Sequence, residues 1–382
     1  MRDGVFRLGL AGGGPGSFIG PVHVMAAQLD GRIRLAGGVF SRDRERSAQA
    51  AAAYGVPAFP SVEAMFASGD IDLVCIATPN DSHYAIARAA LKAGIHVMSD
   101  KPATLTLDEA FALYDDVAAS NCQYGLTHTY TGYPMVREAR ALVASGVLGS
   151  VRKVVVEYSQ GWLSQPLHNK QAANKQAEWR TDPAKSGLGG CSGDIGTHAF
   201  QLAEFVTGQG VTELFGDLAA VVPGRALDDD CNLLLRFANG ARGVLIASQI
   251  AAGDRNGLRL RVYGDKGGAH WCQENPNSLT INWHDGPTEV RHAGSSYLVP
   301  AAQAATRLPA GHPEGYIEAF ANLYRDFAGQ IVSGAPSLVP GITDAVRGMA
   351  FVAAAVKSSD SRLWLPLSDF LPTKLTQDST RT

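Results

Sequence analysis

Short apolar runs alternate with helical stretches along the first third of the chain. The apolar runs are residues 5–11, 33–40, 71–77 and 95–98, and the helical stretches are residues 20–29, 44–54, 61–68, 82–93 and 106–119. Strands and helices that alternate at this spacing are typical of a parallel sheet with helices on both faces. We therefore expect an α/β domain with a doubly wound parallel sheet over residues 1–127.

The pattern changes after residue 127. Longer apolar stretches at residues 151–158, 212–221, 230–237, 242–250 and 258–264 predict strands, and helices are expected at 314–331 and 342–357. Asn239-Gly240 lies between two of these strands and is a strong hairpin signal. The sequence predicts an α+β domain over residues 128–372 with an antiparallel or mixed sheet. Residues 373–382 are expected to be a loose polar tail.

The overall charge excludes some classes of partner. The 382 residues include 33 Lys and Arg and 36 Asp and Glu, which gives a net charge of −3 without a dense basic block. This balance argues against nucleic acid or an anionic membrane as the main partner. No apolar run approaches the roughly 20 residues of a membrane helix, and the first expected strand leaves no room for a signal peptide.

The five cysteines are scattered and form no C-x-x-C pair. This usage predicts neither a zinc site nor a disulfide framework, and it fits a reducing compartment. We therefore expect a soluble cytoplasmic protein without a metal site.

A glycine cluster follows the first expected strand and precedes a helix. It reads Gly12-Gly13-Gly14-Pro15-Gly16. Strand, glycine loop and helix together are the dinucleotide-binding arrangement, in which glycines let the backbone approach the pyrophosphate and free helix N–H groups meet its charge. The next fitting glycine is Gly20, so three extra residues interrupt the usual spacing.

Cofactor choice is expected at the end of the second strand, where the chain has Ser41-Arg42 followed by Asp43. A hydroxyl and a guanidinium suit the 2′-phosphate of NADP, whereas an acidic residue suits the ribose of NAD. The pair favours NADP. In the alternative, Arg42 stacks on adenine or points to solvent while Asp43 or another group holds the ribose of NAD.

The tripeptide Asp100-Lys101-Pro102 ends the apolar run 95–98. In open α/β sheets this carboxyl edge is where ligands bind. A Lys at this edge can donate or accept a proton when burial or neighbouring charges lower its pKa. The alternative is a surface Lys beside an Asp, stopped by a Pro.

A second motif spans residues 189–198 and contains Asp194 and His198. If Asp194 opens a helix that continues through Phe205, the two side chains lie at i and i+4 on one face. A carboxylate one turn from an imidazole can orient it and raise its basicity. The alternatives are an N-capping Asp with a core His, or a metal site, for which only two ligand types converge.

Together these motifs resemble the Gfo/Idh/MocA family (glucose–fructose oxidoreductase, inositol dehydrogenase and MocA) over nearly all of the chain. The resemblance is carried by the glycine loop, by Ala77-Thr78-Pro79-Asn80 with His83, by residues 93–97 leading into Asp100-Lys101-Pro102, by Trp179-Arg180 and by residues 189–198. The chain departs from the family at two positions. Asp100 replaces the usual Glu, and Gln201 stands where the family often has Asp.

The resemblance implies an NAD(P)-dependent oxidoreductase that converts a secondary alcohol of a sugar, glycoside or cyclitol to a ketone, or the reverse. It implies that Lys101 relays the proton beside the nicotinamide, that His198 is the general base, and that Asp194 orients His198 and binds substrate. The residues expected around the cofactor are Gly12, Gly14, Gly16, Ser17, Phe18, Ile19, Ser41, Arg42, Thr78, Pro79, Asn80, His83, Asp100, Lys101, His128, Trp179 and Arg180. A small polyol is the implied partner, with a homodimer or homotetramer formed through a large open sheet.

Two other functions stay open. A relative with the same fold could use tightly bound nicotinamide in a transient redox cycle for glycoside hydrolysis or elimination. A non-catalytic nucleotide-sensing protein is expected to lack the set of Lys, Asp and His that this chain carries. The polar or aromatic candidates for the substrate pocket, each with a structural role as its alternative, are His128, Trp162, His168, Arg180 and His312.

Overall fold

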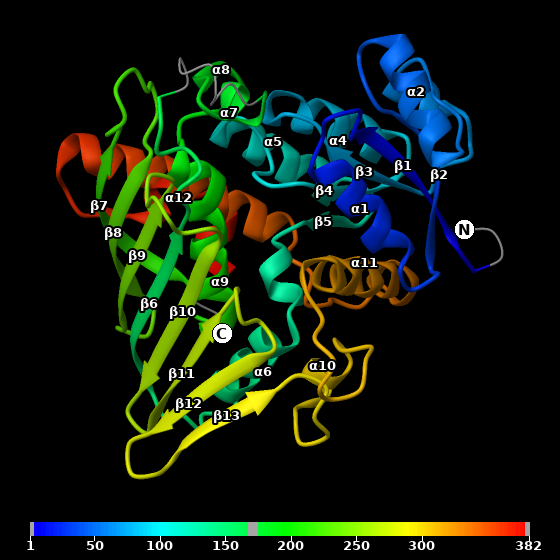
Figure 1. Ribbon diagram of the computed structural model, residues 1–382. Helices are drawn as coiled ribbons and strands as arrows, with labels where there is room; N and C mark the ends of the chain where they lie inside the picture. The colour runs from blue at the N-terminus through cyan, green and yellow to red at the C-terminus, as the bar shows by residue number, and fades with distance from the viewer. Residues whose placement is uncertain (1–3, 167–174, 379–382) are drawn as a thin grey trace. The chain divides into compact units, whose positions relative to one another are not determined.

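The chain divides into two compact units. The computed structural model describes residues 4–166 and 175–378 (Figure 1). The first unit comprises Met1–Gly132 and Tyr316–Val346, and the second comprises Tyr133–Gly315 and Arg347–Thr382. This grouping differs from the predicted boundary after residue 127, because residues 316–346 return to the first unit. The cause is the helix α11 (Tyr316–Ser333), which contacts α1 (Ile19–Gln28).

The first unit is built on a five-stranded parallel sheet. Its strands are β1 (Phe6–Gly12), β2 (Ile33–Val39), β3 (Leu73–Ala77), β4 (His96–Ser99) and β5 (Tyr124–Leu126). They lie in the order β2-β1-β3-β4-β5, and every pair is parallel. The chain leaves β1 toward β2 and then crosses back to β3, so the strand order reverses between β1 and β3. The carboxyl ends of strands at such a switch point form the ligand crevice of doubly wound folds.

The remaining helices of the first unit follow the strands as predicted. They are α2 (Arg44–Tyr54), α3 (Val62–Ala67), the short 3₁₀ turn η1 (Asn80–Ser82), α4 (His83–Lys92), α5 (Leu107–Ala118) and the 3₁₀ turn η2 (Thr129–Gly132). Side-chain caps fix the starts of α2, α3 and α5, and at α3 the Ser61 hydroxyl accepts from the Ala64 amide. Thr106 and Glu109 form a capping box at α5, and the Asp43 carboxylate accepts the Arg46 amide at α2.

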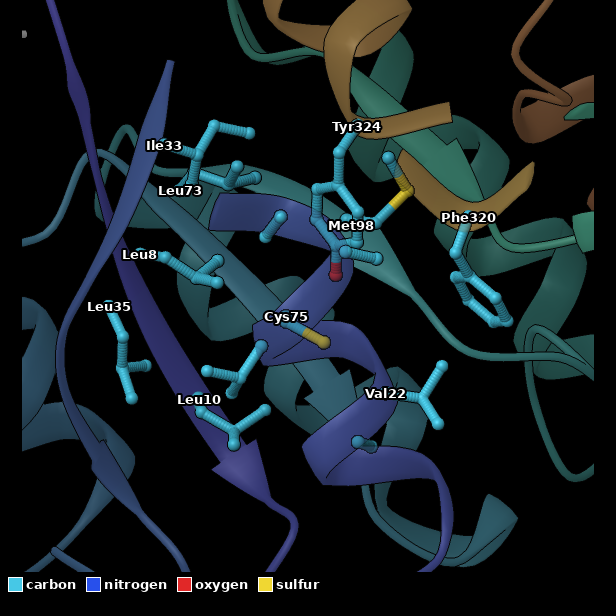
Figure 2. Packing of buried hydrophobic residues seen from close by; sticks show 14 of the residues in the cluster. Leu8, Leu10, Val22, Ile33, Leu35, Leu73, Cys75, Met98, Phe320 and Tyr324 are labelled. Carbon is cyan, nitrogen blue, oxygen red and sulfur yellow. The ribbon is translucent and has the colours of Figure 1, made fainter. Parts of the chain in front are cut away.

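A buried apolar cluster joins this sheet to α1 and α11. Leu8, Leu73 and Cys75 have no exposed surface, and Phe320 and Tyr324 of α11 are almost fully buried against them. Figure 2 shows Tyr324 directed into the cluster, with its hydroxyl toward Cys75. Strands covered on both faces need continuous apolar runs, which explains why β1 and β3 read that way in the sequence.

The second unit contains a nine-stranded sheet. The strands are β6 (Val151–Ser159), β7 (Val211–Ala219), β8 (Asp230–Phe237), β9 (Arg242–Ser248), β10 (Gly257–Gly264), β11 (Gly267–Cys272), β12 (Ser278–Trp283), β13 (Thr288–His292) and β14 (Leu365–Pro366). Their order is β13-β12-β11-β10-β6-β9-β8-β7-β14. The pair β6–β9 is parallel, and the other pairs are antiparallel.

This architecture confirms the predicted fold class, a parallel Rossmann sheet followed by an α+β unit with a mostly antiparallel sheet. The turn at Asn239-Gly240 joins β8 to β9, with Gly240 at φ +84°. The sequence prediction missed β5 and β14, which have only three and two residues, and it also missed β11, β12 and β13. The apolar positions of these last three strands are few and are interrupted by polar and aromatic residues.

The helical segments of the second unit are α6 (Pro134–Ala144), α7 (Lys175–Arg180), α8 (Pro183–Ser186), the π-turn η3 (Ser192–Gly196), α9 (Thr197–Thr207), α10 (Pro300–Gln303), most of α12 (Ile342–Ser361), the 3₁₀ turn η4 (Leu367–Phe370) and α13 (Thr373–Asp378). The loose tail predicted from residue 373 is wrong for α13, because Leu375 is buried and anchors that helix. Residues 379–382 lie outside the described part. None of the described helices is long and apolar enough to span a membrane.

We predict that Phe327→Ala in α11 destabilises the first unit by about 3–5 kcal/mol, because it removes a large side chain from a closed core. Phe327 is fully buried, whereas Val332 in the same helix is 67% exposed. Val332→Ala is the matched control, with an expected change within about 0.5 kcal/mol. Urea unfolding followed by circular dichroism measures both. Equal stability of the two variants would contradict the placement of α11 in this core.

Candidate functional site

The glycine loop after β1 has a backbone that side chains would obstruct. A Cβ on Gly12 would lie 2.4 Å from the Ala77 carbonyl oxygen, and a Cβ on Gly20 would lie 2.2 Å from the Gly13 Cα. Gly20 therefore lets α1 pack closely on the loop, the role of the third glycine in the dinucleotide fingerprint. The first turn of α1 carries no acidic residue. An anionic pyrophosphate suits this cradle in both shape and charge.

The predicted loop residues all lie between β1 and α1. The Ser17 amide donates to the Gly14 carbonyl, and the Ser17 hydroxyl accepts from the Gly20 amide at 3.2 Å. Phe18 is 64% exposed, and Ile19 begins α1. Gly16 has φ +84°, a backbone conformation that favours glycine. The loop is thus held by its own backbone while its surface stays open to a ligand.

The end of β2 places Arg42 at the surface. Its side chain is 88% exposed and lies 3.8 Å from the Asp81 carboxylate. The Ser41 hydroxyl accepts from the Asp43 amide, and the Asp43 carboxylate caps α2. The acidic group that would hold a ribose in the alternative interpretation is therefore engaged with the helix, while the guanidinium extends into solvent.

The turn after β3 is tied to the turn after β4 by His83. Its Nδ1 lies 2.8 Å from the Pro102 carbonyl oxygen and its Nε2 lies 2.8 Å from the Thr78 carbonyl oxygen. His83 is 1% exposed and Asn80 is 3% exposed, whereas Pro79 is exposed. Through these contacts the His83 side chain links the two backbone turns.

Asp100 and Lys101 stand where β4 ends. The Asp100 amide donates to the Ile76 carbonyl at 2.8 Å, and its carboxylate accepts from the Thr127 hydroxyl at 2.8 Å. The Lys101–Pro102 peptide bond is cis, and Lys101 is half-buried. The structure thus brings Lys101 to the same edge of the sheet as the glycine loop.

His128 follows β5 and is fully enclosed. Burial, reinforced by the positive charge of Lys101, lowers the pKa of His128 to about 3. A neutral imidazole beside Lys101 follows from this environment.

In the second unit, Asp194 lies in the π-turn η3 and does not open α9, which begins at Thr197. The predicted helix start at Asp194 is therefore wrong. Asp228 explains the local fold, because its carboxylate accepts from the Gly190 and Ser192 amides at 2.7 Å each. π-turns inside helical segments are frequent at functional sites.

The Asp194 carboxylate has two donors that lie far from it in sequence. Its Oδ2 accepts from Arg180 Nε at 3.1 Å and from Gln249 Nε2 at 2.8 Å. The Arg180 guanidinium also lies 4.2 Å from the centre of the Trp179 ring. The structure thus places Trp179 and Arg180 of α7 with Asp194, and it adds Gln249, which the sequence analysis missed. A polar residue directly after the apolar run of β9 was the signal available for Gln249.

His198 is the second residue of α9 and is 7% exposed. Its ring lies 6.2 Å from that of Tyr158 on β6. The Tyr158 hydroxyl donates to Asn256 Oδ1 at 2.6 Å, and Gln160 Nε2 donates to the same oxygen at 2.8 Å. Asp194 and His198 therefore belong to a part of the unit rich in amide and aromatic groups.

The three remaining candidates for the substrate pocket differ in their surroundings. Trp162 is 40% exposed and donates from its ring nitrogen to Gln160 Oε1 at 2.9 Å. His312 is exposed in the loop before α11. His168 lies outside the described residues. Within residues 4–166 and 175–378, no three His, Cys, Asp or Glu side chains are grouped as a metal site requires.

Comparison with known proteins identifies the family. Residues 6–128 match the oxidoreductase family with an NAD-binding Rossmann fold, and residues 136–270 match the GFO/IDH/MocA C-terminal domain. The chain belongs to the GFO/IDH/MocA oxidoreductase family.

Several relatives cover most of the chain. It is 34% identical over 333 residues to the uncharacterized oxidoreductase YfiI of Bacillus subtilis, which is 84% of each chain. An inositol dehydrogenase homolog from Azotobacter vinelandii, solved with NAD⁺, is 34% identical with a TM-score of 0.90, over 95% of this chain and 98% of that one. Levoglucosan dehydrogenase of Pseudarthrobacter phenanthrenivorans is 28% identical, over 76% of this chain and 79% of that protein.

We predict that His128 makes stability depend on pH. Because its pKa falls from 6.5 to about 3 on folding, the unfolded chain binds a proton first as the pH drops. Stability is complete above pH 6.5 and falls by about 1.4 kcal/mol per unit below it. His128→Gln removes this contribution, so its deficit relative to wild type should shrink by about 2 kcal/mol between pH 8 and pH 5. Urea unfolding at both pH values measures this change, and a constant deficit would contradict it.

Proposed function

We propose that the protein is an NAD(P)-dependent dehydrogenase that oxidises a secondary alcohol of a sugar, glycoside or cyclitol to a ketone, or catalyses the reverse reaction. The observation that carries the proposal is Lys101 at the carboxyl edge of a sheet whose glycine loop suits a dinucleotide. Membership of an oxidoreductase family with an NAD-binding fold supports it.

The cofactor residues follow from the first unit. The loop from Gly12 to Ile19 would hold the pyrophosphate, and Asn80 and Asp100 would line the nicotinamide side. When bound, NAD(P)⁺ supplies the hydride acceptor for the oxidation. His83 would hold the turns after β3 and β4 in place, because both of its ring nitrogens meet their carbonyl groups.

The proton-transfer roles are assigned to Lys101 and His198. Oxidation of a CH–OH group releases the hydroxyl proton as the hydride leaves carbon, so the chain must provide a base for that proton. A neutral His198 can accept it, and the Lys101 ammonium can stabilise the developing alkoxide and relay the proton. Asp194 would bind a substrate hydroxyl, since its carboxylate is oriented by Arg180 and Gln249.

A neutral polyol suits the groups around Asp194. Amide groups donate hydrogen bonds to hydroxyls and accept them, carboxylate groups accept them, and tryptophan rings pack against the C–H faces of sugars. An Azotobacter vinelandii inositol dehydrogenase homolog has been solved with NADH and myo-inositol, and levoglucosan dehydrogenase is a further relative. These relatives support inositols and anhydrosugars as the first compounds to assay.

The proposal also concerns the choice between NAD and NADP. The homolog solved with NAD⁺ supports NAD. The exposed Arg42 and the engagement of Asp43 with α2 permit the phosphate of NADP. We propose that the enzyme uses NAD and that Ser41 and Arg42 let it accept NADP as well, whereas the sequence favours NADP and leaves NAD as the alternative.

We further propose that the chain assembles as a homodimer or homotetramer through the nine-stranded sheet. Leu234 of β8 and Val290 of β13 are about half exposed on that sheet, so their apolar surface is available to a partner subunit. Light scattering of the purified protein measures the assembly.

We predict that Lys101→Ala and His198→Asn each lower kcat by about 100-fold or more, the scale of general acid–base catalysis. Dinucleotide affinity should change little, because neither substitution removes the glycine loop. Absorbance at 340 nm with a panel of inositols, glycosides and sugars measures turnover. Lys92→Ala on the exposed face of α4 is the control and should keep wild-type turnover.

Two outcomes would overturn this assignment. One is near-wild-type turnover in either variant. The other is a tightly retained nicotinamide with substrate consumed and no net change at 340 nm, which would indicate a transient redox cycle that ends in hydrolysis or elimination.

We predict that Arg42→Ala weakens NADP binding about tenfold and leaves NAD binding within about twofold, because one charge-assisted hydrogen bond to phosphate contributes roughly 1.5–3 kcal/mol. Arg34→Ala, at an exposed position of β2, is the control. Quenching of protein fluorescence by each dinucleotide gives the affinities. Equal losses for NAD and NADP would remove Arg42 from cofactor discrimination.

A further inference from the structure

A chain of buried polar groups lies behind Asp100 in the first unit. It runs from Cys75 on β3 through Tyr324 on α11 to His23 on α1, and from His23 to Asp100; we call it the His23 chain. The His23 Nδ1 lies 2.8 Å from the Tyr324 hydroxyl. Figure 2 shows Tyr324 and Cys75 facing each other inside the apolar cluster.

His23 has no exposed surface, and its environment favours the neutral ring. Burial lowers the pKa of His23, the negative charge of Asp100 opposes this shift, and His83 adds to it. Its ring also packs edge-on against Phe320, with centres 5.0 Å apart. A neutral imidazole carries one N–H, so its two nitrogens must differ.

The Asp100 carboxylate indicates which ring nitrogen of His23 carries the proton. Its negative charge faces His23 Nε2 and favours the imidazole proton on that nitrogen. His23 Nδ1 then accepts the hydroxyl proton of Tyr324. Among the described residues, His23 Nε2 has no hydrogen-bond partner, and Asp100 Oδ1 lies 3.9 Å from it.

One oxygen of the Asp100 carboxylate faces both Thr127 and His23 in this arrangement. The Asp100 Oδ1 accepts from the Thr127 hydroxyl at 2.8 Å and faces the His23 Nε2. A separation of 3.9 Å is too long for a hydrogen bond, but a buried N–H dipole still attracts a carboxylate at that distance. The next residue along the backbone is Lys101.

We propose that His23, in the tautomer protonated on Nε2, is a positioning residue that holds the Asp100 carboxylate, together with Thr127, and thereby fixes the backbone that presents Lys101. The kinetic consequence rests on the proposed function, in which Lys101 takes part in proton transfer. The tautomer and its coupling to Asp100 do not depend on that function.

The first test is spectroscopic and needs no turnover. Protein labelled with ¹⁵N-histidine gives the protonation of each ring nitrogen from long-range ¹H–¹⁵N spectra, with His23 assigned by its loss in His23→Gln. We expect a proton on Nε2 from pH 6 to pH 8 and a shift of the Nε2 signal in Asp100→Asn. A proton on Nδ1, or no response to Asp100→Asn, overturns the proposal.

The second test compares variants that each keep a polar group near one of the two ring nitrogens of His23. His23→Asn keeps an amide near the Nδ1 position and loses the donor toward Asp100, whereas His23→Gln keeps an amide near the Nε2 position. Because a small misplacement of a catalytic group is costly, we expect His23→Asn to lower kcat about tenfold or more with KM little changed. His23→Gln should retain kcat within about threefold of wild type.

Thr127 offers a second pair of variants. Thr127→Val removes the hydroxyl with its shape kept, and Thr127→Ser restores the hydroxyl, so kcat should fall in the first and recover in the second. His96→Gln is the matched control, because His96 is on the same strand as the Asp100 turn but accepts the Gln123 amide at the other end. Urea unfolding identifies variants that fail to fold.

The outcomes separate the two proposals. If the wild-type protein turns over no polyol, the proposed function fails and the spectroscopic test still decides the role of His23. If the wild type is active and folded His23→Asn has wild-type kcat, the positioning role is overturned. The same holds if His23→Gln loses as much activity as His23→Asn.

Discussion

The hydrogen bond from the Asp100 amide to the Ile76 carbonyl determines what the end of β4 can present. It continues the pairing of β3 with β4 to Asp100, so that Lys101 is the first residue to leave the sheet. Thr127 holds the Asp100 side chain, and His83 holds the carbonyl of Pro102. The turn is therefore fixed from three directions by residues of β3, α4 and the segment after β5. Because the turn is rigid, only the side chain of Lys101 loses conformational entropy when it is held in position. A loop anchored at one end would lose backbone entropy as well.

The order of the elements in the first unit could be predicted because its signals are local. Buried parallel strands need continuous apolar runs, and capping residues such as Thr106 with Glu109 indicate where helices begin. Local signals could not predict the packing partner of α11, because the sequence of a helix does not specify which distant elements its apolar face contacts. Phe320 and Tyr324 read as one apolar face, and only the fold shows that this face completes the core around β1 and β3.

The local structure around Asp194 differs from the helix start that the sequence predicts. The spacing of Asp194 and His198 assumed a regular helix, whereas the Asp228 carboxylate holds Gly190 and Ser192 and a π-turn follows. Asp228 is 34 residues from Asp194 in sequence, and Gln249 is 55 residues away. Local periodicity carries no information about such contacts. Arg180, which the family resemblance places at the cofactor, donates to Asp194 within the second unit.

The charges around Asp194 bear on the class of substrate. Arg180 and Asp194 carry opposite charges and are bonded to each other, while Gln160, Gln249 and Asn256 are neutral amides. A phosphorylated or acidic sugar needs a cation whose charge is not already neutralised, and Arg180 would have to give up Asp194 to serve as one. Because both groups are largely buried, separating them would leave a carboxylate with one donor fewer in a poorly solvated place. The balance therefore favours an uncharged polyol, whose hydroxyls can join the network without displacing either charge.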